Sequence, residues 1–447
     1  MGLKYEDVAE QVLDMAKRQG RVQAEVFLLD SQELTIEVAQ MNMENLKLAH
    51  ERGVGLRVIS DGRPGYAYSS DLSYPALQVL VKKALGNARQ AEADPGWELP
   101  GPAGSYNFME LYDEETFLVP VEEKIKLAQS MEEAARSYDR RIKVTEKAVY
   151  HDAKYRVTIY NSMGLAGNYQ GSYCGGYIVV VGQENGDSET GFGLHYSVKY
   201  RGIDPQKIGR EAGEKAVRML GAKPIPSGQM PVVLEPYTAT NFLGILQAAF
   251  SAEAVLKEKS FLKGEEGKQV ASSLVTIIDD GTLHERLGSS PFDGEGVPTS
   301  RTVLVEEGKL IGYLHNAYTA GKFGVSSTGN CVRSTYKSTP EVGTTNFFIK
   351  EGKACRNELV EELPYGLYIT DVLGMHTANP VSGDFSIGAS GLLIENGEFT
   401  RPFKGIAVAG NLKELLADID AVADDLTFFM GKGAPTLRIK ALSISGK

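Results

Sequence analysis

YTATNFLGILQAAFSAEAVLKEK, residues 237–259, is the stretch around which the chain is organised. Its apolar side chains recur at steps of three and four residues, the spacing of one helix face; they are Phe242, Ile245, Leu246, Ala249, Phe250 and Val255. Pro236 suits a first helical turn, and Thr238 or Thr240 is the expected cap. Because alanines occupy several remaining faces, the sequence predicts a helix buried inside its domain.

Short strand-like runs separated by glycine-containing turns surround this stretch. They are LVTIIDDG, TSRTVLVEEGKLIGYL, TTNFFIKEG, GLYITDVLG, SGLLIENGEF and TLRIKALSISG. So many strands around one apolar helix predict a strongly curved or closed antiparallel sheet that holds the helix.

The first half of the chain alternates helical and strand-like patterns. Apolar spacing predicts helices over 6–19, 74–91, 120–138 and 204–220, with strands between the members of each pair. Asp61 and Gly62 predict a hairpin turn, and Gly53 and Gly55 a tight bend. This order indicates two similar halves in one domain, joined by an aromatic-containing segment over 92–119 that is either a surface-wrapping arm or a mobile loop.

The sequence therefore predicts an α+β protein with two domains. An N-terminal α+β domain of antiparallel strands and helices occupies 1–221, and the proline- and glycine-rich segment 222–229 is the linker. The C-terminal domain, 230–447, is the strongly curved or barrel-like antiparallel sheet around the helix 237–259.

The composition argues against some classes of function. Among 447 residues, 58 acidic side chains outnumber 47 Lys and Arg, giving a net charge of −11. That balance argues against a nucleic-acid partner, which requires clustered basic residues. No apolar run approaches the length of a membrane span, and the N-terminus lacks the pattern of a signal peptide, so we expect a cytoplasmic protein without membrane contact. Three scattered cysteines predict reduced thiols.

Two pairs of residues resemble parts of catalytic or metal-binding motifs, but neither pair has the neighbours that such a motif requires. The pair His284–Glu285 follows a DDG turn and has no second histidine at helical spacing, so it is interpreted as surface chain. Asp279 and Asp280 are adjacent in a strand and would point to opposite faces, which favours a role in the turn before Gly281.

The densest polar cluster lies between Gly374 and Gly391. Its candidate substrate- or partner-binding residues are His376, Asn379, Ser382, Asp384 and Ser386. Such a loop can present hydrogen-bond donors and acceptors to a peptide backbone or a partner chain. It can equally be a turn that bonds only itself, and His376 with Asp384 could form an acid/base pair.

Several motifs resemble one known family. VASSLVTIIDDGTL at 270–283, the run 293–330, GMHTANPVSGDFSIGASG at 374–391 and, more loosely, GVGLRVISDGRPGYAYSSDLS at 53–73 are similar to the PmbA/TldE branch of the TldD/PmbA ("modulator of DNA gyrase") family. In the TldD branch, the helix before the first motif carries an HExxxH zinc motif. The corresponding segment here reads AAFSAEAVLKEK and contains no histidine.

The resemblance implies the metal-free subunit of a cytosolic zinc metallopeptidase complex that degrades or processes unfolded peptides and peptide precursors. It implies a TldD-like partner that carries the zinc, no metal ligand, cofactor or catalytic residue in this chain, and a homodimer as a further state when the chain is alone. The alternative is a non-enzymatic peptide-binding or scaffold homodimer. A third interpretation is an independent hydrolase that uses His376 and Asp384.

Overall fold

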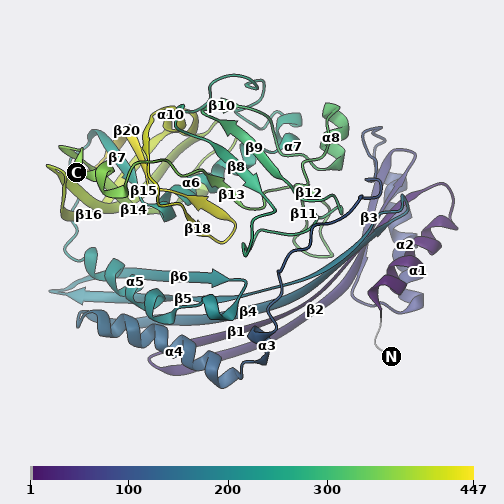
Figure 1. The fold of residues 1–447 in the computed structure, drawn as a ribbon, viewed down its shortest axis with the longest axis horizontal. Helices are drawn as coiled ribbons and strands as arrows, with labels where there is room; N and C mark the ends of the chain where they lie inside the picture. The colour runs from purple at the N-terminus through teal and green to yellow at the C-terminus, as the bar shows by residue number, and fades with distance from the viewer. Residues whose placement is uncertain (1–3) are drawn as a thin grey trace.

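The computed structural model describes residues 4–447, and its N-terminal domain is built on one six-stranded antiparallel sheet (Figure 1). The strands are β1 (Gln23–Ala39), β2 (Asn42–Ser60), β3 (Arg63–Ser69), β4 (Ile142–Asn161), β5 (Ala166–Glu184) and β6 (Asp187–Ser197). They lie in the order β3-β2-β1-β4-β5-β6, so two three-stranded meanders meet where β1 pairs with β4. The long strands curve, and the sheet is concave toward the C-terminal domain.

Helices cover the other, convex face of this sheet at both ends. They are α1 (Tyr5–Lys17), α2 (Tyr74–Gln90), α4 (Val121–Tyr138) and α5 (Pro205–Arg218), close to the predicted ranges. Along β1 the side chains alternate: Val26 and Leu28 pack with α1 and α2, and Leu34 and Ile36 pack with α4 and α5. Phe27 and its neighbours at odd positions therefore face the concave side.

The glycine-marked bend predicted in β2 is wrong. Gly53 and Gly55 both lie within the continuous strand, and the turn occurs only at Asp61 and Gly62, whose φ angles are 50° and 71°. A Cβ atom on Gly53 would lie 2.3 Å from the ring of Tyr336 in the C-terminal domain. The glycine permits close packing between domains rather than a change of chain direction.

The C-terminal domain contains the predicted barrel. Its strands are β7 (Gly228–Leu234), β14 (Tyr365–Leu373), β15 (Asp384–Glu395), β16 (Glu398–Asn411), β17 (Ile419–Val422) and β20 (Leu437–Ser445). The order is β16-β15-β14-β7-β20-β17, and pairing of β16 with β20 closes five of them into a barrel. One pairing, β7 with β14, is parallel.

A second, smaller sheet packs on the opposite side of the domain core. It has the order β10-β9-β8-β13-β19-β18, and its strands are β8 (Ile277–Asp280), β9 (Arg301–Glu306), β10 (Lys309–Leu310), β13 (Phe347–Ile349), β18 (Thr427–Phe429) and β19 (Lys432–Ala434). A short hairpin, β11 (Cys331–Val332) and β12 (Glu341–Val342), extends toward the N-terminal sheet. The remaining short helices are α3 (Glu115–Leu118), η1 (Tyr200–Gly202), α8 (Ala317–Phe323), α9 (Arg356–Glu361), η2 (Met375–Thr377) and α10 (Leu412–Ala417).

The predicted central helix is buried, but it is two helices. α6 (Pro236–Ala249) carries Phe242 and Leu246 into the domain core, as expected. The chain then breaks at Ser251, whose hydroxyl accepts a hydrogen bond from the backbone N–H of Ala254 and caps α7 (Ala252–Leu256). A serine that caps a new helix ends the previous one, which the apolar periodicity of 237–259 could not reveal.

The expected threonine cap of α6 is also wrong. Glu235 occupies the N-cap position without a side-chain cap bond, and the Thr240 hydroxyl instead donates to the carbonyl of Tyr237 at 2.7 Å. Pro236 does begin the helix, as predicted.

The segment between α2 and α3 is the wrapping arm predicted for 92–119. It runs from α2, at one end of the N-terminal sheet, to α3, near the middle of the long strands (Figure 1). Trp97 stacks on Tyr318 of α8 with ring centroids 4.1 Å apart, and the Tyr106 hydroxyl donates to the carbonyl of Gly296 at 2.8 Å. The arm thus ties the two domains together. No helix within residues 4–447 is long and apolar enough to cross a bilayer.

Candidate functional site

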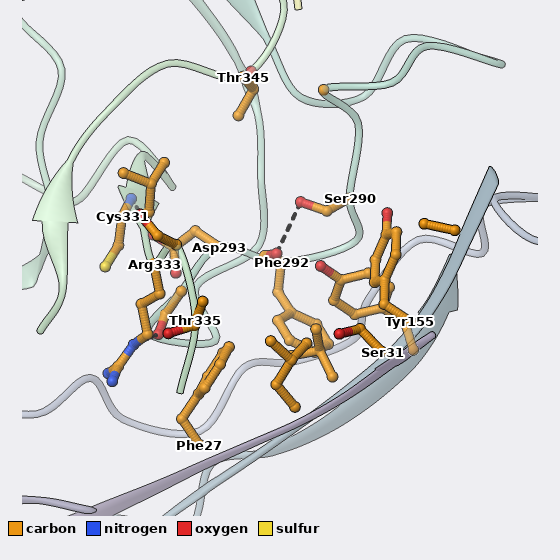
Figure 2. Close-up of a pocket in the computed structure, with 18 of the residues that line it drawn as sticks. Phe27, Ser31, Tyr155, Ser290, Phe292, Asp293, Cys331, Arg333, Thr335 and Thr345 are labelled. Atoms are coloured by element: carbon orange, nitrogen blue, oxygen red, sulfur yellow. Dashed lines mark hydrogen bonds between the residues drawn. The ribbon is translucent and has the colours of Figure 1, made fainter. Parts of the chain in front are cut away.

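A cavity of about 340 Å³, called here the interdomain cavity, lies between the concave face of the N-terminal sheet and the C-terminal domain. Its floor consists of side chains from β1, β2, β4 and β5, and its roof of three segments, 288–294, 331–335 and 344–345. Figure 2 shows Phe27, Ser31 and Tyr155 rising from the sheet toward Phe292, Asp293 and Thr345. The cavity exists only because the two domains dock.

Aromatic rings form a continuous tract through the cavity wall. Tyr155 and Tyr169 make an edge-to-face pair at 6.1 Å, Tyr169 packs edge-on against Phe292 at 5.0 Å, and Phe292 lies 4.7 Å from Tyr106 of the arm. A Cβ atom on Gly171 would lie 2.4 Å from the Tyr155 ring, so this position must be glycine for the ring to lie across β5.

Beside the cavity, four charged side chains form a buried ion cluster. Arg57 of β2 donates to Glu25 of β1 at 2.7 Å and to Glu295 of the C-terminal domain at 2.6 Å. Arg333 also pairs with Glu25, and each of these side chains is at most 4% exposed. Two guanidinium groups are therefore matched by two carboxylates, and the burial makes each pair dependent on the others.

Asp293 adds a third buried carboxylate to this region. Its oxygens accept backbone hydrogen bonds from Glu295 at 2.9 Å, from Val297 at 3.0 Å and from Cys331 at 3.0 Å. Burial raises the pKa of Asp293 to about 7, and the nearby negative charge of Glu295 adds to the rise. Burial likewise raises the pKa of the Cys331 thiol well above its ordinary value, so this cysteine is a neutral wall residue.

Asp279 fixes two of the cavity loops. Its carboxylate accepts from the Asn330 amide at 2.6 Å, and from the backbone and hydroxyl of Thr345 at 2.8 and 2.7 Å. Desolvation raises the pKa of this carboxyl. Asp280 performs the predicted turn function by accepting from the backbone and hydroxyl of Thr282. For Asp279 the turn interpretation is wrong, because its partners come from loops far along the chain.

A second opening, called here the α6–α7 groove, adjoins the interdomain cavity and has a volume of about 640 Å³. The two share Val332 and Thr344 in their walls. The groove is lined by Gln247, Ala248 and Ser251 at the junction of the two helices, and by the hairpin strand β12 on the other side. Thr344 donates to the Gln247 amide oxygen at 3.2 Å.

The groove lies at the segment that corresponds to the HExxxH helix of the resembled family. Catalytic zinc is held by imidazole, thiolate or carboxylate ligands. The junction instead presents an amide, a methyl group and a hydroxyl from Gln247, Ala248 and Ser251. The groove also holds the carboxylates Glu253 and Glu341, but Glu253 is paired with Lys257 and no imidazole or thiolate from residues 4–447 lines the groove. In the part of the chain that the structure describes, no three His, Cys, Asp or Glu side chains are grouped so as to hold a metal ion. The donor set does not fit a catalytic zinc ion, and the metal-free state stays a prediction.

The loop 374–391 holds the predicted site residues, and most of their polar atoms bond within the loop. The Asn379 side chain accepts from the backbone of Val381 at 2.9 Å. The Asp384 carboxylate accepts from the Ser382 hydroxyl at 2.7 Å and from the Asn411 amide at 2.9 Å, and both hydrogen bonds lower its pKa. The carbonyl of Ser386 accepts from the Thr377 hydroxyl at 3.3 Å.

His376 is exposed on the same loop, in the short helix η2, and the Asp384 carboxylate is bonded to other partners. The geometry thus resembles the self-bonded turn that the sequence left open as an alternative. A binding role for His376, Asn379, Ser382, Asp384 and Ser386 stays a prediction. The pair His284–Glu285 is exposed, and Glu285 forms an ion pair with Lys199, as expected for surface chain.

Sequence reasoning missed the residues of the interdomain cavity. Asp293 and Arg333 line the cavity, and Glu25 and Arg57 lie beside it. The pairs Arg57–Glu295 and Glu25–Arg333 form only when the two domains dock. A usable signal was present in DGEG, residues 293–296, which places two carboxyl groups at the start of one of the segments that resemble the family.

Comparisons with known proteins agree with the fold and the motifs. Residues 24–88, 115–220 and 227–446 match domain 1, the central domain and the C-terminal domain of the PmbA/TldA metallopeptidases. A Haemophilus influenzae protein named metalloprotease TldD homolog is 30% identical over 89% of this chain and 87% of its own length. Escherichia coli O157:H7 metalloprotease PmbA is 29% identical over 90% and 88%.

A solved structure shows the same architecture over the full length. A Thermotoga maritima protein named for modulation of DNA gyrase superposes with a TM-score of 0.91 at 29% identity, covering 99% of this chain and 100% of its own. The chain therefore belongs to the PmbA/TldD metallopeptidase family.

Proposed function

We propose that this chain is the non-metal-binding subunit of a TldD/TldE-type zinc metallopeptidase complex that degrades or processes unfolded peptides and peptide precursors. The observation that carries the proposal is the α6–α7 groove, where Gln247, Ala248 and Ser251 stand in the segment that corresponds to the zinc motif. Membership of a metallopeptidase family together with this donor set favours a subunit that supports catalysis by a partner.

In this proposal the partner is a TldD-like chain with an HExxxH helix, and the zinc ion belongs to that partner. This chain contributes an enclosing surface and contacts to the substrate. The interdomain cavity and the groove share Val332 and Thr344 in their walls, which places both within reach of one extended peptide. A cytoplasmic location follows from the same proposal.

Affinity capture tests the assembly. The tagged chain is expressed in its own cells and captured, and bound proteins are identified; we expect a family member with an HExxxH motif. The mixture should cleave an unfolded peptide, and a zinc chelator should abolish that activity, whereas the chain alone should be inactive. Capture of no such partner, with homodimers as the only species, would instead favour the scaffold interpretation.

Elemental analysis of the separated chain tests the absence of metal. After dialysis without chelator we expect far less than one zinc ion per chain. A stoichiometric zinc ion would overturn the assignment of this chain as the metal-free subunit, because it would require a ligand set outside the groove.

A further inference from the structure

The interdomain cavity carries an excess of negative charge. Arg57 and Arg333 are already neutralised by Glu25 and Glu295 in the buried ion cluster. Glu33 adds a carboxylate on the floor of the cavity. Asp293 lines the roof, but its raised pKa of about 7 means that it adds no full negative charge below neutral pH. Glu33 is an exposed carboxylate that makes no ion pair within residues 4–447. It raises the pKa of the nearby His151 imidazole, but burial lowers that pKa overall, so His151 does not neutralise Glu33.

The third carboxylate of the cavity wall, Glu51, is partly balanced. Lys337 approaches its Oε1 atom at 2.7 Å, and this pair lies at the rim, where the side chains are 50% and 37% exposed. Pairs at such exposure are weak and are screened by salt. The cationic side chains of the region are therefore committed elsewhere, while Glu33 is left to attract a positive charge from outside the chain.

The aromatic wall strengthens this preference. Ring faces attract ammonium and guanidinium groups, and several rings around one cavity form the kind of cage that proteins use for alkylammonium ligands. Phe27 already has a guanidinium group over it, that of Arg333 at 4.9 Å from the ring centroid. Tyr155, Tyr169 and Tyr173 also line the cavity, and no cation of the described chain lies over their rings.

The size and position of the cavity indicate which part of a ligand it can hold and where the rest of the ligand would lie. A volume of about 340 Å³ is at the lower end for ligand pockets, enough for one side chain and the adjoining backbone. The cavity shares the walls formed by Val332 and Thr344 with the α6–α7 groove. A chain whose cationic group lies in the cavity can thus continue as an extended segment into the groove.

We propose that the interdomain cavity binds the cationic group of an extended peptide, with Glu33 as its ionic partner and the rings of Tyr155, Tyr169 and Tyr173 around it. This rests on the proposed function, since it names the class of peptide that the subunit holds. An ammonium or guanidinium group can come from a lysine or arginine side chain or from the peptide N-terminus. An anionic ligand is disfavoured, because Glu25 and Glu295 balance the charges of Arg57 and Arg333, and the one Arg333 nitrogen without a hydrogen-bond partner, Nη1, is buried.

Calorimetric titration of the isolated chain with short peptides tests the proposal. The first probe is a pentapeptide of alanine with a central lysine, acetylated at its N-terminus and amidated at its C-terminus. The matched probes replace the lysine by norleucine or by glutamate, and a fourth has norleucine with a free N-terminus. We expect the lysine peptide to bind about tenfold more tightly than its norleucine counterpart.

The fourth probe separates the two sources of the cation. If the norleucine peptide with the free N-terminus binds as tightly as the lysine peptide, the cavity recognises the α-ammonium group. If only the lysine peptide binds tightly, the cavity recognises a side chain. Either result supports a cation site, whereas equal binding of all four peptides would overturn it.

Two variants on β1 test whether the peptide binds in the cavity. Glu33→Gln removes the ionic partner. We expect it to weaken binding of the lysine peptide about three- to tenfold, with little effect on binding of the norleucine peptide. Glu37 lies on the same strand, β1, and faces the same side of the sheet as Glu33, but outside the cavity. Glu37→Gln should therefore leave the binding of both peptides unchanged. Equal effects of the two variants would overturn the assignment of Glu33.

The failure of this inference is distinguishable from failure of the proposed function. The titration uses the chain alone, so the absence of a metallopeptidase partner cannot abolish binding. Conversely, a chain that captures its partner and supports zinc-dependent cleavage but shows no preference for cationic peptides would retain the proposed function and lose only the cation site. Circular dichroism of each variant confirms that the fold is retained.

Discussion

Arg57 of the N-terminal sheet donates a 2.6 Å hydrogen bond to Glu295 of the C-terminal domain, and the two side chains are 4% and 0% exposed. The same guanidinium group also bonds Glu25, so one arginine joins two carboxylates across the domain boundary. Domain docking therefore determines whether these charges are compensated.

Arg57→Met should destabilise the protein strongly. It leaves Glu295 and one oxygen of Glu25 buried without their cation, a situation that costs about 3–5 kcal/mol in other buried pairs. The free energy of unfolding, from denaturant titration, measures the loss. Lys126→Met, which breaks an exposed pair with Glu123, is the control and should produce no measurable change. Equal effects would mean that the buried cluster does not hold the domains together.

Asp293→Asn should change how stability depends on pH. The folded state keeps the Asp293 proton up to about pH 7, whereas the unfolded chain releases it near pH 4. The stabilising contribution of Asp293 to the folded protein is therefore lost as the pH rises through that interval. Asparagine does not titrate. Between pH 5 and pH 7, the free energy of unfolding of the variant should therefore rise by about 2 kcal/mol relative to that of the parent protein.

Thermal or denaturant unfolding of both proteins across this pH range measures the difference. A constant offset between them is expected from the altered hydrogen bonds to the backbone of Cys331 and its neighbours, so only the slope is informative. Parallel curves would show that Asp293 is ionised in the folded protein throughout the range.

Tyr318→Ala should release the arm. Tyr318 stacks on Trp97, the single tryptophan of the chain, and its hydroxyl donates to Asp94 at 2.9 Å. We expect faster chymotryptic cleavage at Phe108, which is 93% exposed on the arm, and a red shift of the tryptophan emission as water reaches the ring. Tyr74→Ala, an exposed tyrosine of α2, should change neither signal. An unchanged cleavage rate would mean that other contacts hold the arm.

Asp384→Ala tests the predicted site loop. The carboxylate holds the Ser382 hydroxyl and the Asn411 amide, so we expect a modest fall in Tm and no effect on partner capture beyond that fall. His376→Ala is the complementary variant, since His376 is exposed and a contact with a partner is the function predicted for it. Weaker capture by His376→Ala at an unchanged Tm would establish the loop as an interface.

Local patterns in the sequence were sufficient for the elements. The helices α1, α2, α4 and α5 were predicted to within a few residues, because each buries one apolar stripe against a sheet and the stripe has a helical period. The closed barrel followed from many short strands around one apolar segment. The break at Ser251 was missed because capping competes with a periodicity that continues on both sides of it.

What the sequence by itself determined was therefore the secondary structure, the α+β class, the core position of Phe242 and Leu246, and the motifs that carry the family resemblance. Only the tertiary structure decided the interdomain cavity and the bonding of the loop 374–391. The physical reason is separation along the chain: Glu25 and Arg333 pair across 308 positions. Such a contact leaves no periodic signal, since it depends on how two finished domains dock.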